Sequence, residues 1–265
     1  MFKLKLPRPA RNRFARIFIT LSRKKLAAAG CALAAAAIFA AVSHPAVVGA
    51  SASERMLPVY SVERDGKTVS LTFDAAWGNE DTDLLIGILG RYGVRATFFV
   101  VGAWAERYPQ SVKALSDSGH EVMNHSDDHA HFTKLSPGEI TANISEANRK
   151  IAEACGASPT LFRAPYGEYD DNVIKTVASM GMTTVQWDVD SLDWKGISAE
   201  EITKRVTGKV SPGSIVLFHN AAEHTPEALP GIIEFLIREG YAILPVSELL
   251  LDGTHTIDHA GRMRK

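Results

Sequence analysis

The sequence His125-Ser126-Asp127-Asp128-His129 contains two histidines four positions apart. On a helical turn, side chains at this spacing lie on one side, where two imidazoles can bind the same divalent metal ion. The zincin motif has a glutamate after its first histidine, and Ser126 stands there instead, which argues against a metalloprotease. A catalytic metal usually has three protein ligands and a water, so a carboxylate from elsewhere in the chain is needed.

Reactive side chains stand at the ends of five β-rich segments. In chain order they are Asp74, His125, Arg163, the acidic stretch 188–193 and His219. Each has an ordinary alternative role, since an aspartate after a strand is often a helix N-cap and an arginine beside acids often forms only an ion pair. Their shared position favours a site, because the carboxyl ends of parallel strands meet at one rim of an α/β fold. A carboxylate as general base and a histidine as general acid would suit metal-assisted hydrolysis there.

Helices and strands are expected to alternate from residue 69 onward. Glycines end five helix-like stretches just before β-rich runs, at positions 93, 119, 156, 181 and 240. Ser136 and Ser198 begin capping boxes, and Pro109 and Pro226 stand near expected first helical turns. Seven β-rich segments, separated mostly by helices, predict parallel strands with helical crossovers. This pattern fits either a closed barrel or an open doubly wound sheet.

The formal net charge of −1 is divided unequally along the chain. Residues 1–50 contain nine basic and no acidic side chains, whereas the remaining 215 residues contain 20 basic and 30 acidic ones. The uncharged residues 26–43 follow the basic ones, an order typical of a secretory signal or an uncleaved membrane anchor. We therefore expect the body of the protein to be exported. An acidic body is unsuited to nucleic-acid binding, and two cysteines exclude a disulfide scaffold.

The reactive residues resemble, in order, the five motifs of the NodB-homology polysaccharide deacetylases, also called carbohydrate esterase family four. The matching segments are Thr72-Phe73-Asp74, His125–His129, Arg163–Gly167, Asp190–Trp194 and Leu217-Phe218-His219. The resemblance covers about residues 68–250. It implies an α/β fold, a distorted (β/α) barrel of about seven parallel strands. It also implies a hydrolase that removes N-acetyl groups from an amino-sugar polymer such as peptidoglycan or a chitin-like glycan.

The resemblance also implies a role for each residue of the motifs. It assigns catalytic roles to four residues: Asp74 is the base, Arg163 contacts it, His219 is the acid and Asp193 is the partner of His219. It assigns metal binding to His125 and His129, and substrate binding to Tyr166, Trp194 and Leu217. At the Tyr166 position the backbone N–H helps to hold the oxyanion. The implied cofactor is a divalent metal, zinc in the first place, with cobalt or manganese as alternatives.

One position departs from the family pattern. The first motif usually ends in two aspartates, the second of which binds the metal, and here Ala75 stands in that place. The form T-F-D-x-x-W-G resembles a branch that includes sporulation-associated members. Water or another carboxylate could complete the metal site, with Asp127, Asp128 and Asp81 as candidates. The two histidines could instead bind metal weakly, or the chain could be a catalytically weak or inactive glycan-binding protein. An O-acetyl esterase acting on xylan is a further alternative.

These expectations divide the chain into four parts. Residues 1–50 are a signal peptide or membrane anchor, 51–67 a linker, 68–250 the deacetylase domain and 251–265 a polar tail. We expect an exported monomer that binds a polysaccharide containing N-acetylglucosamine. It would contact the membrane only through an uncleaved N-terminal segment, and it would bind no nucleic acid.

Overall fold

The sheet of the computed structural model, which describes residues 55–265, is centred on two long parallel strands, β2 (Thr68–Ala75) and β8 (Ser214–His219). From β2 it continues in parallel through β3 (Thr97–Val100), β4 (Glu121–Asn124), β5 (Leu161–Phe162) and β6 (Thr183–Thr184). Two short strands pair in parallel beside these, β7 (Val189–Asp190) with β8 and β9 (Ala242–Ile243) with β2. The seven strands expected from the sequence are all present, and β7 is one of four further short strands.

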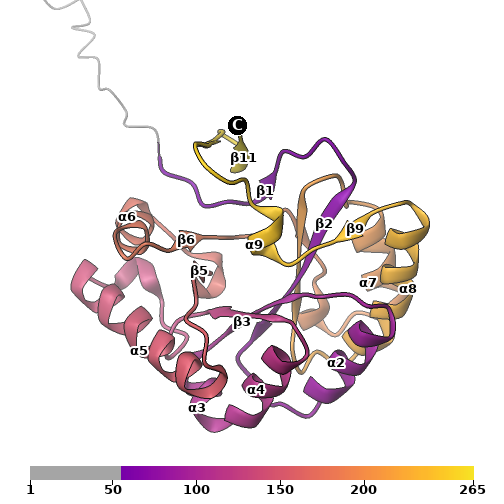
Figure 1. Ribbon diagram of the computed structural model, residues 1–265, viewed down its shortest axis with the longest axis horizontal. Coiled ribbons are helices and arrows are strands. Elements are labelled where there is room, and N and C mark those ends of the chain that lie inside the picture. The colour runs from indigo at the N-terminus through magenta and orange to yellow at the C-terminus, as the bar shows by residue number, and fades with distance from the viewer. Residues whose placement is uncertain (1–54) are drawn as a thin grey trace, which may run out of the picture. The chain divides into compact units, whose positions relative to one another are not determined.

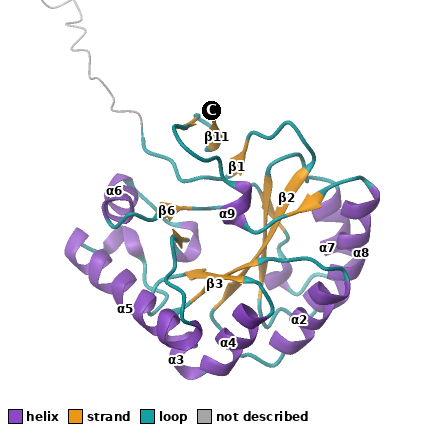
Figure 2. Cartoon of the chain, viewed as in Figure 1, coloured by secondary structure: helices purple, strands orange, loops and turns teal. Residues whose placement is uncertain are grey.

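Helices lie around the outside of the curled sheet, and the strands gather in the centre (Figures 1 and 2). They are α2 (Thr82–Arg91), α3 (Gly102–Arg107), α4 (Pro109–Asp117), α5 (Pro137–Cys155), α6 (Asp171–Ser179), α7 (Ala199–Thr207), α8 (Thr225–Arg238) and α9 (Val246–Leu249), with the 3₁₀ turns η1 (Phe132–Lys134), η2 (Pro165–Gly167) and η3 (Asp193–Lys195). The expected capping boxes are present at Ser136 and Ser198, and each holds a helix start by reciprocal hydrogen bonds.

Along β2, successive side chains point alternately toward the surrounding helices and toward the opposite face of the sheet. Phe73 points to the helix layer, where its ring stacks on Phe98 and Phe218 at centroid distances of 4.8 and 5.4 Å. A fully buried phenylalanine contributes about 1.5–3 kcal/mol. The neighbouring side chains of Thr72 and Asp74 point to the opposite face, because successive residues of a strand alternate. Packing of the apolar side chains therefore fixes the direction of the Asp74 carboxylate.

The segment expected to be a linker takes part in the barrel. The N–H of Val59 donates to the carbonyl of Thr184 beside β6, and the carbonyl of Val59 accepts from Gln186. Two residues later, β1 (Ser61–Val62) pairs antiparallel with β8 at Ser214. Residues 59–62 thus bridge the two ends of the parallel sheet. The linker prediction is wrong for these residues, because their pairing partners are more than 120 residues away in the sequence.

The expected polar tail is also part of the sheet. Strand β11 (Arg262–Arg264) pairs in parallel with β1, and β10 (Thr256–Ile257) pairs antiparallel with β11. Met263 is 1% exposed and packs in the apolar cluster inside the barrel with Val59 and Val62. The segment reads as polar because one buried methionine among charged residues gives almost no hydrophobic pattern.

The expected signal peptide or anchor, residues 1–50, lies outside the described residues. Among residues 55–265, no helix has the length and apolar character needed to cross a bilayer.

We predict that Met263→Ala lowers the free energy of unfolding by about 2–4 kcal/mol, because it opens a cavity in the cluster that joins β11 to the barrel. Denaturant unfolding measures this change. The exposed His259→Ala in the same segment is the control and should leave stability within about 0.5 kcal/mol of the unchanged protein. Equal stability of the two variants would contradict an integrated C-terminal segment.

Candidate active site

A buried ion pair joins Asp74 at the end of β2 to Arg163 after β5. The guanidinium Nη1 lies 2.7 Å from Oδ1 of Asp74 and also donates to the Thr72 hydroxyl at 2.9 Å. Arg163 is fully buried, and Asp74 is 6% exposed. Burial works to raise the pKa of Asp74, but the neighbouring His125 and the charge and hydrogen bond of Arg163 outweigh it and lower the pKa below its usual value. The carboxylate is therefore ionised near neutral pH.

A second carboxylate orients His219 at the end of β8. Oδ1 of Asp193 lies 2.8 Å from Nδ1 of His219, and Oδ2 accepts from the His219 backbone N–H and the Thr225 hydroxyl. Burial works to lower the pKa of His219, but the hydrogen bond to Asp193 and the charge of Asp74 outweigh it and raise the pKa above its usual value. The imidazole thus favours its protonated form and keeps Nε2 available to a ligand.

The two histidines of the H-x-x-x-H segment lie close together, but not on a helix. Residues 125–131 form a loop after β4, in which Ser126 and His129 have left-handed φ values of 73° and 60°. The ring centroids of His125 and His129 are 5.1 Å apart. The prediction of a helical turn is wrong here, although the expected proximity of the two imidazoles is present.

The chemistry of both imidazoles fits a divalent metal. Nδ1 of His125 lies 2.9 Å from the carbonyl oxygen of Arg163, which can only accept, so Nδ1 carries the proton and Nε2 a lone pair. Nδ1 of His129 is buried, and no described residue hydrogen-bonds to it. Burial lowers the pKa of both rings, to about 4 for His129, and so keeps them neutral, as metal ligands must be.

A third protein ligand is missing from the described part of the chain. No cluster of three or more His, Cys, Asp or Glu side chains suited to a metal occurs in residues 55–265. Of the three candidates, Asp127 pairs with Lys150, Asp128 accepts from Asn143, and Asp81 accepts from the Ala221 N–H. The Ala75 methyl is 1% exposed and packs in the apolar cluster on the helix side of β2.

The expected site residues surround one cleft of about 480 Å³. Its lining includes Asp74, His125, His129, Tyr166, Trp194, Leu217 and His219. Arg163 and Asp193 are buried behind it, each bonded to a lining residue. Tyr166 has a left-handed φ of 60°, and its ring lies edge-on to His129 at 4.6 Å. A strained backbone at this position fits a segment whose conformation is set by function.

Sequence reasoning gave no role to several residues of this cleft. Trp77 is 65% exposed and lines it together with Trp187 and Asp190. Asn220 follows the last motif and holds the Trp77 loop, since its Oδ1 accepts from the Ala76 N–H at 3.1 Å and its Nδ2 donates to the Trp77 carbonyl. Trp77 could have been found as an aromatic residue three positions after Asp74. Nothing in the sequence around Asn220 indicates its contact with a loop 143 residues earlier.

Comparison with known families and proteins agrees with this arrangement. The family model described as polysaccharide deacetylase matches residues 61–185. The peptidoglycan-N-acetylglucosamine deacetylase of Bacillus cereus is 35% identical over 176 residues, which are 65% of this chain and 64% of that protein. The chitooligosaccharide deacetylase of a Bradyrhizobium species is 31% identical over 214 residues, which cover 73% of this chain and 98% of that protein. The chain thus spans less than two thirds of the Bacillus cereus relative.

Solved structures share the fold. Wild-type BA3943 of Bacillus anthracis, described as a CE4 family pseudoenzyme, aligns with a TM-score of 0.70 and 36% identity over 72% of this chain and 68% of that chain. A BA3943 mutant described as having restored enzymatic activity aligns with the same TM-score and 37% identity, over 72% and 70% of the two chains.

Proposed function

The chain belongs to the polysaccharide deacetylase family, and we propose that it hydrolyses N-acetyl groups on an amino-sugar polymer, peptidoglycan or a chitin-like glycan. The observation that carries this proposal is the pairing of Asp74 with Arg163 and of His219 with Asp193 at one cleft. One pair supplies an ionised carboxylate and the other a protonated imidazole, which are the base and acid that amide hydrolysis needs.

Asp74 acts as the base in this proposal. Its carboxylate accepts the proton of the water that attacks the acetamide carbon, and Arg163 keeps it ionised and oriented. The charge on the carbonyl oxygen of the tetrahedral intermediate is stabilised by the backbone N–H of Tyr166. The left-handed backbone of Tyr166 supports this role, because residues with a side chain rarely adopt this conformation, and where they do it is often at a functional site.

His219 acts as the acid. It donates the proton from Nε2 to the sugar nitrogen as the C–N bond breaks, and Asp193 stabilises the charged ring through Nδ1. Acetate and a free amino sugar leave the cleft. Trp194 and Leu217 line the same cleft and offer apolar surface to the sugar ring.

His125 and His129 are the residues that would hold a divalent metal, zinc in the first place and cobalt or manganese as alternatives. Deacetylases of this family are generally metal-dependent. When bound, such a metal supplies a Lewis acid that polarises the acetamide carbonyl and makes water a better nucleophile. With Ala75 in place of an acidic ligand, the site has less negative charge and binds the metal more weakly.

A polymer fits the surface around the cleft better than a single sugar does. Two further hollows, of about 360 and 440 Å³, adjoin Trp77, which also lines the central cleft. One is bordered by Trp104 and Tyr108, and the other by Trp194. Trp77 and Trp194 are exposed, and rings so placed are suited to stacking on successive sugars.

A second candidate function follows from Ala75 and from the likeness to BA3943. In this candidate the chain binds glycan through the same cleft but releases no acetate, because metal occupancy is too low. Under both candidates we propose an exported monomer, with residues 1–50 as a cleaved signal or an anchor. The nine basic residues of that segment and the uncharged stretch 26–43 support export. An O-acetyl ester, as in xylan, would meet the same base and acid.

We predict that Asp74→Asn lowers acetate release at least about 100-fold, because an amide cannot accept the proton of water. The measurement is acetate released from peptidoglycan, chitin oligomers and acetylated xylan by the purified protein with added zinc or cobalt. The exposed Asp117→Asn is the matched control and should keep full activity. Equal release by the two variants would contradict the role of Asp74. An unchanged protein that binds chitin oligomers but releases no acetate would favour the second candidate.

We also predict that Ala75→Asp raises cobalt affinity by at least about tenfold, because it adds a charged ligand beside two neutral ones. When a chelator has removed the metal, the same variant should be less stable than the unchanged protein, because its carboxylate enters an apolar cluster. Isothermal titration and thermal unfolding measure the two effects. The control is Ala75→Asn, which adds a similar volume without the charge. Equal cobalt affinity of both variants would show that position 75 does not reach the metal.

A further inference from the structure

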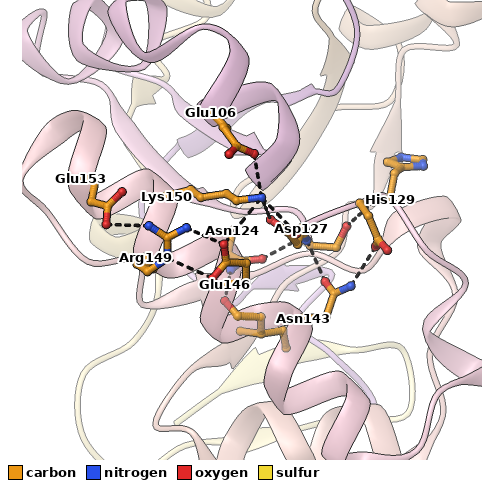
Figure 3. A network of polar contacts seen from close by, with 12 residues as sticks. Glu106, Asn124, Asp127, His129, Asn143, Glu146, Arg149, Lys150 and Glu153 are labelled. Carbon is orange, nitrogen blue, oxygen red and sulfur yellow. Dashed lines mark hydrogen bonds and ion pairs between the residues drawn. The ribbon is translucent and has the colours of Figure 1, made fainter.

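Lys150 on α5 directs its ammonium group toward Asp127 in the loop of residues 125–131, here called the histidine loop (Figure 3). Its Nζ lies 2.9 Å from Oδ1 and 3.2 Å from Oδ2 of Asp127, and 3.0 Å from Glu106 on α3. The Lys150 side chain is 11% exposed and that of Asp127 is 21% exposed, whereas Glu106 is largely in solvent. The pair of Lys150 and Asp127 is therefore the shielded contact of this cluster, where solvent screening is weak.

The Asp127 carboxylate lies between helices α3 and α5. A Cβ atom added to Gly102, the first residue of α3, would overlap the Asp127 carboxylate and come within 3.0 Å of the Ala147 Cα on α5. The Asp127 carboxylate thus occupies a space between α3 and α5 that any side chain at position 102 would fill. It cannot turn toward the cleft without leaving this space.

The backbone on either side of Asp127 is held by the same helices. The Asp127 N–H donates to the Asn143 side chain on α5 at 2.7 Å, and the Asp127 carbonyl accepts from the Ala103 N–H at the start of α3 at 2.8 Å. Asn143 also donates to Asp128 at 2.8 Å. These contacts fix the residues between the two histidines.

The conformation so fixed is a costly one. Ser126 and His129 both occupy the left-handed region, which residues with a side chain adopt only when the surroundings impose it. Without its contacts to α3 and α5, the loop would relax to right-handed or extended backbone. The distance between the two imidazoles would then no longer be set before a ligand binds.

We propose that Asp127 and Lys150 are positioning residues whose ion pair holds His125 and His129 ready for a metal ion. The inference rests on the proposed function of these histidines as metal ligands. Removing Lys150 leaves a poorly paired carboxylate in a packed site, and that carboxylate moves toward solvent and takes the loop with it. Metal binding must then order the loop as well, which weakens it.

This role of Asp127 excludes its use as the third metal ligand, and the two roles predict opposite effects. As a positioning pair, Lys150→Met and Asp127→Asn both weaken metal binding. As a ligand, Asp127 would be released by Lys150→Met to reach the metal, so that binding would strengthen in this variant while Asp127→Asn still weakened it.

The first measurement is the cobalt affinity of the full chain by titration. We expect each single variant to bind cobalt about tenfold more weakly, as for other residues that orient metal ligands, and the double variant to be no weaker than either single one. Lys113→Met removes an exposed lysine from an ion pair on α4 and should leave cobalt affinity unchanged. Cobalt binding by Lys150→Met as tight as that of the unchanged protein, or tighter, would overturn the proposal.

The second measurement needs no metal. Hydrogen exchange at the amides of Asp127 and His129 should become faster in both single variants, while exchange in β2 and β8 and in the Lys113→Met control stays the same. Unchanged exchange at these amides would also overturn the proposal. If the unchanged protein binds no cobalt, the metal part of the proposed function fails, and the exchange data still decide whether the ion pair holds the loop.

Discussion

The fully buried guanidinium of Arg163 is the constraint on which the site depends. It stacks on the ring of Phe99 at 4.0 Å and donates to Asp74, to Thr72 and to the Gln186 carbonyl. A charge placed this deep is tolerated only with a charged partner and hydrogen bonds. The barrel therefore needs Asp74 in its ionised form as much as Asp74 needs the arginine. The same ion pair is thus required both for the stability of the fold and for the ionised state of the base.

Charges of opposite sign shift the pKa values of the base and the acid on the two sides of the cleft. On one side a fixed positive charge helps to lower the pKa of a carboxylate, and on the other a buried carboxylate helps to raise the pKa of His219. Between them, burial keeps His125 and His129 neutral. This division of charge provides a base, an acid and a pair of nitrogen ligands within one hollow. Ala75 removes one negative charge from the metal side and leaves the base and the acid in place.

Much of the site could be predicted from the sequence, because β-rich segments that end in reactive residues can be recognised there. Asp74 and His219 lie at the ends of the two long buried strands β2 and β8, so both the strands and the rim were predictable. The conformation of the histidine loop was not, because left-handed backbone at Ser126 and His129 depends on contacts with helices α3 and α5. Strands β1 and β11 were missed for a similar reason. They are two or three residues long, and their pairing comes from distant partners.

If ion pairing gives Asp74 and His219 their working protonation states, this dependence will show in a pH profile of kcat/KM for acetate release. The ordinary pKa of histidine is about 6.5 and that of His219 is raised, so we expect kcat/KM to be still high at pH 6.5 and to decline only at higher pH, as His219 loses its proton. In Asp193→Asn the decline should move to lower pH, because the charge that raises the pKa is gone. A decline centred at or below about pH 6.5 in the unchanged protein, with no shift in the variant, would show that Asp193 does not set the protonation state of His219.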